Sequence, residues 1–318
     1  MAINVQDQIK EILKNRAGIN LFFALKEKDG NIAVRQADLK DGDTQEHLKR
    51  QFISLLQEDF SDNQEFHMLE LSSADERKNA LYHYDMKEFP QSLEYFSGFD
   101  YKEKHLKFMF GKDDLINLEA YIIVIGTQEK HCVLYKKFYP VFLMGRGGFF
   151  LFPSKQRFEE FDNELLRVSR DYQLLRIDSD IYVKDLKILE RYGGFKKIIE
   201  KEAVSAVENI EKLNILEDGE GLRETLTQDI TFARKLCKIG RTSPVLLNHI
   251  PNETIIKFSK TCPALSGQLR YSEDGERILL TTKKSQKLFI KLLEDSYLVS
   301  QLTNLYYESL AKERIISS

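Results

Sequence analysis

Apolar and polar residues follow a strand-like pattern in the first part of the chain. Two mostly apolar runs, Ile19–Leu25 and Ile32–Ala37, flank a tight polar turn that contains Gly30, and this arrangement predicts a β-hairpin. Asp43 and Glu46 then form a helix-capping pattern, and apolar residues recur after them at helical spacing. This part of the chain therefore predicts strands together with an amphipathic helix.

The centre of the chain contains four apolar runs of strand length. They are Tyr121–Ile125, Cys132–Phe138, Val141–Met144 and Phe149–Phe152. Their close succession predicts an antiparallel meander. The turn between the last two runs, Gly145–Gly148, is rich in glycine, but a strand follows it instead of the helix that a P-loop requires. We therefore interpret it as a hairpin turn.

Helical spacing dominates the C-terminal part. Phe195–Leu213 carries apolar residues on one face, a second helix is expected from Thr225 to a stop at Gly240, and Asn252–Thr261 forms a short third helix. The stretch Leu288–Leu310, which contains neither Gly nor Pro, is predicted to be mainly helical, either continuous or broken near Asp295. The whole pattern predicts an α+β fold, with antiparallel hairpins in the N-terminal and central part and a mostly helical C-terminal part.

The composition is that of a globular protein. The chain has 318 residues, of which 42% are hydrophobic and 31% charged, and a length of about 150 residues per domain predicts two domains. Its three cysteines are isolated, which favours a reducing compartment over a disulfide framework. No apolar run approaches the ~18–20 residues of a membrane span, and no signal peptide is recognised. We therefore expect a cytoplasmic protein without direct membrane insertion.

Charge is segregated along the chain. Residues 1–120 hold 16 basic and 23 acidic residues, whereas residues 121–318 hold 31 basic and 27 acidic ones. We therefore expect an acidic N-terminal domain over 1–120 and a C-terminal domain over 121–318. Within the second domain, residues 230–291 contain 12 basic residues against four acidic ones. Such a segment in a weakly acidic protein is typical of proteins that bind the phosphate backbone of nucleic acids.

Two predicted helices of this basic segment supply the candidate contacts with double-stranded DNA. The contacts are Arg234, Lys235, Lys238, Arg241, Lys283, Lys284, Lys287 and Lys291. Lysines at the start of the second helix oppose the helix dipole, which favours an anionic ligand there. Two other interpretations stay open: a basic face that is merely solvated, and a face for an acidic protein partner, including the acidic part of another copy in a homo-oligomer.

Motifs for catalysis or metal binding are scarce. The six histidines are scattered, and no spacing predicts a metal or cofactor site, so we expect neither. One alternative is a Mg²⁺-dependent nuclease, in which Asp178 or Asp180 holds the metal together with Asp185, and Lys187 stabilises the developing charge. Because carboxylates and lysines are abundant in this chain, we do not expect an enzyme and assign no catalytic residue.

Several short stretches resemble one protein family. They are Phe232–Leu236, Asp295–Thr303, Tyr306-Tyr307 with Lys312 further on, and Arg157–Phe161. In these stretches, and in its length and organisation, the chain resembles the KwaB-like family, the soluble subunit of the bacterial two-component Kiwa anti-phage system. The stretch Asp295–Thr303 is the most specific of them, and its leucines suggest packing more than chemistry.

The resemblance implies a function that the residues alone do not give. Members of this family are expected to work with a KwaA-like membrane protein, to bind DNA and to restrain the replication or expression of phage DNA. We therefore expect a non-catalytic defence effector that occupies DNA without sequence preference and lies at the inner membrane through its partner. The alternatives are the Mg²⁺-dependent nuclease and an adaptor for the membrane partner that does not bind DNA.

Overall fold

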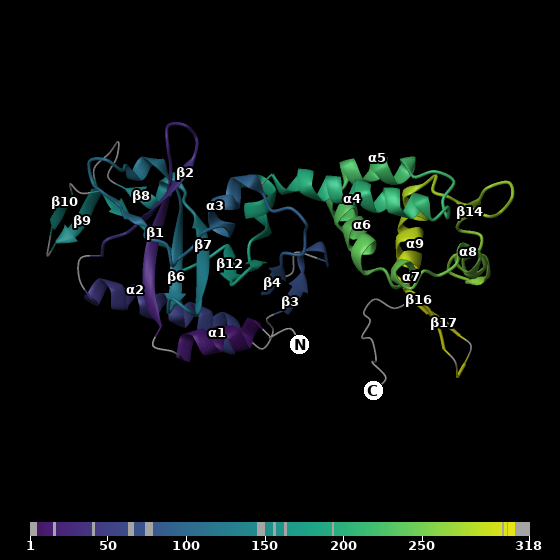
Figure 1. Ribbon diagram of the computed structural model, residues 1–318, viewed down its shortest axis with the longest axis horizontal. Coiled ribbons are helices and arrows are strands. Elements are labelled where there is room, and N and C mark those ends of the chain that lie inside the picture. Colours follow the sequence, from purple (N-terminus) through teal and green to yellow (C-terminus); the bar gives the residue numbers. More distant parts are fainter. Residues whose placement is uncertain are drawn as a thin grey trace. The chain divides into compact units, whose positions relative to one another are not determined.

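A computed structural model describes residues 5–308 of the chain except for 15–16, 40–41, 63–66, 74–78, 145–149, 155–156, 162–163, 193, 301 and 304. The chain divides into two compact units (Figure 1). The first contains most residues up to Gly194, and the second contains Phe195 onward together with Ser72–Ala74. The first unit is built around a large sheet and the second around helices, so the predicted α+β fold with a mostly helical C-terminal part is confirmed.

A nine-stranded sheet in the order β3-β4-β13-β12-β7-β6-β1-β2-β5 forms the centre of the first unit. Its strands are β1 (Gly18–Lys26), β2 (Ile32–Gln36), β3 (His67–Glu70), β4 (Ala80–His83), β5 (Leu106–Lys107), β6 (Leu118–Gly126), β7 (His131–Lys137), β12 (Leu174–Ile177) and β13 (Asp180–Val183). The pairs β2–β5 and β3–β4 are parallel, whereas the other neighbours run antiparallel. The predicted hairpin of β1 and β2 is therefore present.

Helices cover one face of this sheet. α1 (Val5–Lys14) and α2 (Gly42–Gln57) contact the central strands β6 and β1, respectively (Figure 1). Apolar side chains that recur on one face of each helix, such as Ile9 and Phe52, join Ile123 of β6 in one buried cluster. The central strands are buried on both faces, which explains their nearly continuous apolar sequence.

The predicted four-stranded meander is only partly correct. β6 and β7 pair as expected, but β8 (Leu143–Met144) pairs with β11 (Leu165–Leu166), and β9 (Phe150–Ser154) pairs with β10 (Arg157–Phe161). These two small ladders are separate from the large sheet. The glycine-rich turn at 145–148 lies outside the described residues.

The second unit consists of helices and two short hairpins. They are α4 (Phe195–Lys212), α5 (Glu220–Gln228), α6 (Ile230–Thr242), α7 (Pro244–Leu247), α8 (Asn252–Thr261), α9 (Lys283–Leu293), the pair β14 (Arg270–Tyr271) and β15 (Ile278–Leu279), and the pair β16 (Tyr297–Val299) and β17 (Tyr306–Glu308). Across the whole described chain, one α-helix remains, which is α3 (Glu94–Ser97). The other described elements are short helical turns at Glu58–Asp62, Leu71–Ser73, Gln91–Leu93, Leu115–Asn117, Pro140–Phe142 and Ile188–Tyr192.

Helix α6 packs closely on α4 because a glycine faces α4. A Cβ atom on Gly240 would lie 2.9 Å from the Cβ of Ala206, which is closer than such atoms approach in proteins. Gly240 therefore does not stop the helix as predicted, and α6 continues through it to Thr242. The buried side chains of Thr225 and Gln286, whose oxygens lie 2.7 Å apart, tie α5 to α9. The position of α6 and α9 is thus fixed within this unit.

The domain boundary differs from the predicted one. Residue 120 lies inside β6, which pairs with β1 on one side and β7 on the other, so a division there would cut the central sheet. The structure divides the chain at Gly194–Phe195 instead. The change of net charge near residue 120 therefore does not mark a domain boundary.

The predicted helix over Leu288–Leu310 is replaced by a helix and a hairpin. α9 ends at Leu293, and Asp295 adopts a left-handed backbone conformation with φ of 54°. The chain then forms the antiparallel pair β16–β17. Among the described residues, no helix combines the length and the apolar character needed to cross a membrane.

Candidate nucleic-acid interface

Helix α6 carries two of the predicted lysines, of which one is exposed and one is half-buried. Asp229 caps its N-terminus by accepting hydrogen bonds from the backbone N–H groups of Thr231 and Phe232, at 2.9 and 3.1 Å. The apolar face that begins at Phe232 is buried in the second unit. Lys235 lies on the exposed side of the helix, and Lys238 is half-buried.

Helix α9 starts directly at the predicted lysines. Thr282 and Ser285 form a capping box, in which the Thr282 hydroxyl accepts from the Ser285 N–H at 3.1 Å. Lys283 and Lys284 therefore occupy the first two helical positions, where their charge opposes the helix dipole. Lys287 follows at helical spacing on the exposed side.

A pocket of about 330 Å³ lies where α6 meets α9. It is lined by Asp229, Thr231, Phe232, Lys235, Lys287, Ile290, Lys291, Glu294, Ser296 and Glu308. Three lysines predicted as DNA contacts, which come from two helices more than 50 positions apart in sequence, are thus brought to one place. The buried residues Phe232 and Ile290 form an apolar floor below these charges.

The lysines of this pocket differ in their electrostatic partners. Lys291 forms an ion pair with Glu308 of β17. Within the part of the chain that the structure describes, Lys235 and Lys287 have no ion-pair or hydrogen-bond partner. A lysine without a carboxylate partner keeps its full attraction for an external anion, so these two side chains are the best candidates for phosphate contacts.

Burial and pairing change the role of several other predicted contacts. Arg234 is only 2% exposed, so its guanidinium is part of the core and does not reach a DNA backbone. Arg241 pairs with Glu202 of α4, which holds it against its own unit. Lys284 donates to the side-chain oxygen of Gln268 at 2.5 Å. Lys283 is exposed and extends the basic surface along α9.

Two other basic residues of 230–291 show why a charge count overestimates the number of side chains that are available to contact DNA. Arg277 pairs with Glu217 and Asp274, and Lys260 donates to the backbone oxygen of Gly275 at 2.7 Å. The sequence argument also missed the pocket carboxylate of Glu308, which comes from a hairpin that was predicted as helix. No periodicity in the sequence predicts the ion pair between Lys291 and Glu308.

The residues of the nuclease alternative do not converge on one metal position. Asp180 begins β13 and contacts His83 at 3.5 Å, whereas Asp185 lies beyond the other end of that strand, more than about 10 Å along the extended chain. The side chain of Asp185 accepts from Gln173 at 3.1 Å and from the backbone N–H of Lys187 at 3.0 Å. No group of three or more His, Cys, Asp or Glu side chains that could hold a metal occurs among the described residues.

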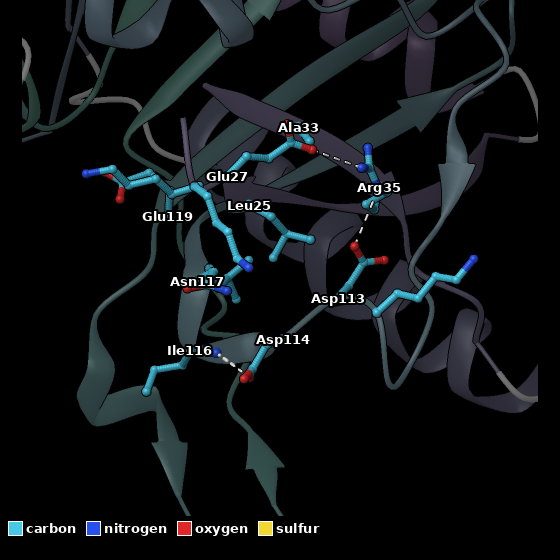
Figure 2. A pocket seen from close by; sticks show the side chains of 13 residues that line it. Leu25, Glu27, Ala33, Arg35, Asp113, Asp114, Ile116, Asn117 and Glu119 are labelled. Carbon is cyan, nitrogen blue, oxygen red and sulfur yellow. Dashed lines mark hydrogen bonds and ion pairs between the residues drawn. The ribbon is translucent and has the colours of Figure 1, made fainter. Parts of the chain in front are cut away.

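A second pocket, of about 430 Å³, lies in the first unit near β1, β2 and β6. Figure 2 shows its central pair, in which Asp113 faces Arg35, and Arg35 also pairs with Glu27 at 3.2 Å. The lining contains as many acidic as basic side chains. The α6–α9 pocket is balanced in the same way, with three lysines and three carboxylates. The two pockets differ in their central cations, because Arg35 is neutralised within its own pocket, whereas Lys235 and Lys287 have no ion-pair partner among the described residues.

Comparisons with known proteins agree on one family. The family model of Kiwa protein KwaB-like proteins matches residues 115–303. Kiwa protein KwaB from Escherichia coli O55:H7 is 32% identical over 322 residues, and the match covers 98% of each chain. No solved structure matches the chain. The resemblance seen in the sequence is therefore confirmed, and the chain belongs to the KwaB-like family of Kiwa proteins.

Proposed function

We propose that this chain is the DNA-binding component of a Kiwa anti-phage defence. Its membership of the KwaB-like family supports a role in that defence. DNA binding is supported by one structural observation, the convergence of Lys235, Lys287 and Lys291 on one pocket between α6 and α9. Lys283 prolongs the same basic face toward the start of α9.

The proposed mode of action is occupation of duplex DNA without cleavage. Lysine side chains contact phosphates, which carry no sequence information, so they position a protein on any duplex. A chain bound in this way obstructs polymerases and other enzymes that move along phage DNA. A KwaA-like membrane protein would hold the chain at the inner membrane, as the family resemblance implies.

The test measures duplex DNA binding over a series of salt concentrations. We compare the wild type with the Lys235→Ala/Lys287→Ala variant. Each phosphate neutralised contributes about −0.9 to the slope of log K against log salt concentration. Loss of two contacts is therefore expected to make the slope shallower by about 1.8. The affinity should fall equally for unrelated duplex sequences.

The matched control is Lys102→Ala/Lys104→Ala, which removes the same charge from two exposed lysines of the first unit. This control is expected to bind DNA as the wild type does. An equal loss in both variants would show that net charge, and not the α6–α9 face, determines binding. Absence of wild-type binding at low salt would refute the proposal and favour the adaptor function, and cutting of a plasmid in Mg²⁺ but not in EDTA would favour the nuclease.

A further inference from the structure

The hairpin β16–β17 carries exposed apolar side chains on both of its faces. Leu298 pairs with Tyr307 and Val299 with Tyr306. Because successive residues of a strand point to opposite faces, the first pair lies on one face and the second pair on the other. The four side chains are between 41% and 52% exposed. Within the described part of the unit, therefore, neither face of the hairpin is fully covered.

The end of the hairpin is also apolar and without charge. Leu302 lies in the turn and is 97% exposed, and Leu305 precedes β17 with 57% exposed. Twelve consecutive residues, Ser296–Tyr307, contain no charged side chain. Single exposed leucines are ordinary on protein surfaces, but a charge-free group of this size marks a contact site.

The base of the hairpin is basic. Glu308, the last residue of β17, pairs with Lys291 and lines the same pocket as Lys235 and Lys287. A strand of three residues spans about 10 Å, so the apolar turn and these lysines are separated by about that distance. Figure 1 shows the hairpin extending away from the helices of its unit. This spacing matches the depth of about 5–10 Å at which apolar groups of peripheral proteins enter the boundary between headgroups and acyl chains.

We propose that the hairpin β16–β17 inserts its apolar end into the surface of an anionic lipid bilayer. Leu302 and Leu305 would enter the acyl boundary, Tyr306 and Tyr307 would lie at the headgroup level, and the lysines at the base would bind lipid phosphates. Tyrosine is suited to this position because its ring is apolar and its hydroxyl is polar.

A lipid surface fits this hairpin better than a protein partner does. A protein with a flat face covers one side of a two-stranded hairpin and leaves the other in water, whereas a bilayer surrounds both. The lysines without ion-pair partners complement anionic headgroups, which attract basic residues close to the membrane surface. This contact needs no spanning helix, and it departs from the sequence-based expectation that membrane contact passes only through a partner.

The absence of tryptophan from the chain allows a direct test with the full-length protein. The variant Leu302→Trp places a single indole at the apolar end of the hairpin. Its fluorescence is expected to shift to the blue when vesicles of phosphatidylglycerol and phosphatidylcholine are added, and not with phosphatidylcholine alone. The matched control is Val141→Trp, which places an indole at a site in the first unit where the native side chain is 76% exposed. Its emission should not change.

A second variant measures binding itself. Leu302→Ser, which removes the apolar side chain without adding a charge, is expected to lower the fraction of protein that sediments with anionic vesicles at least tenfold, whereas Val141→Ser leaves it unchanged. DNA affinity should be the same in both variants, so that failure of this inference and failure of DNA binding are separately visible. The inference is overturned if the wild type does not bind anionic vesicles or if Leu302→Trp keeps its emission. It is also overturned if Leu302→Ser alters only the oligomeric state or only DNA affinity, which would assign the hairpin to a second copy or to DNA.

Discussion

Removal of the carboxylate that neutralises Lys291 is expected to strengthen DNA binding. The change is Glu308→Gln, which keeps the size of the side chain and ends the ion pair with Lys291. Both partners are about 40% exposed, and exposed pairs of this kind contribute only about 0–1 kcal/mol to folding. The variant should therefore remain folded, with three unpaired lysines in the pocket in place of two.

The size of the effect follows from one additional phosphate contact. Two unit charges about 4 Å apart attract one another by about 1 kcal/mol in water, which corresponds to an affinity about five times higher at low salt. The same contact makes the slope of log K against log salt concentration steeper by about 0.9. The advantage of the variant over the wild type should therefore shrink as salt is added.

Fluorescence anisotropy of a labelled duplex, measured from low to physiological salt, gives both quantities. The control is Glu273→Gln, which removes the same charge from an exposed carboxylate of the same basic segment outside the pocket. It should have much less effect than Glu308→Gln. If Glu308→Gln leaves affinity and slope at their wild-type values, Lys291 does not contact phosphate and the pocket is not the interface.

Two further predictions concern pH and packing. Burial lowers the pKa of His83, but hydrogen bonds and charges from Glu70 and Asp180 outweigh this and raise it above its usual value. The stabilisation by protonated His83 is thus complete below about pH 6.5 and lost as pH rises through the folded-state pKa. Urea unfolding should therefore show His83→Gln to be destabilised in mild acid and not at alkaline pH; a constant difference would contradict this. Gly240→Ala introduces a methyl group 2.9 Å from Ala206, so it should destabilise the protein by about 1–3 kcal/mol, and an unchanged urea midpoint would show that α4 and α6 adjust freely.

The sequence was most informative where hydrophobic pattern and local structure coincide. The hairpins β1–β2 and β6–β7 follow from apolar runs around polar turns, and the large sheet brings them together. The sequence pattern was misleading for the residues that follow α9. Leu298, Leu302 and Leu305 recur at helical spacing, yet short apolar runs fit helix and strand equally well. The predicted alternative of a break near Asp295 agrees with the end of α9 at Leu293 and with the left-handed conformation of Asp295, but the pattern did not predict the hairpin that follows.

The sequence predicted which segment is basic, but not which of its side chains are exposed and without an ion-pair partner. Counting basic residues found the segment 230–291, but a count does not reveal that Arg234 is buried or that Arg241 is paired with a glutamate 39 positions earlier. Both properties arise from tertiary packing, and the second comes from the contact between α4 and α6. A count also treats each lysine alike, whereas the pocket separates Lys235 and Lys287 from Lys291, which already has a carboxylate partner.

The caps of α6 and α9 affect how the proposed interface would hold a phosphate. A helix N-terminus binds anions through free backbone N–H groups, but Asp229 already accepts two such bonds at α6, and Thr282 accepts one at α9. The carboxylate of Asp229 also repels a phosphate that approaches the end of α6. Binding would therefore depend on the flexible lysine side chains and not on a rigid backbone cradle. Flexible lysines adapt to phosphates at varied spacings, so this arrangement favours a protein that occupies DNA over one that recognises a particular sequence.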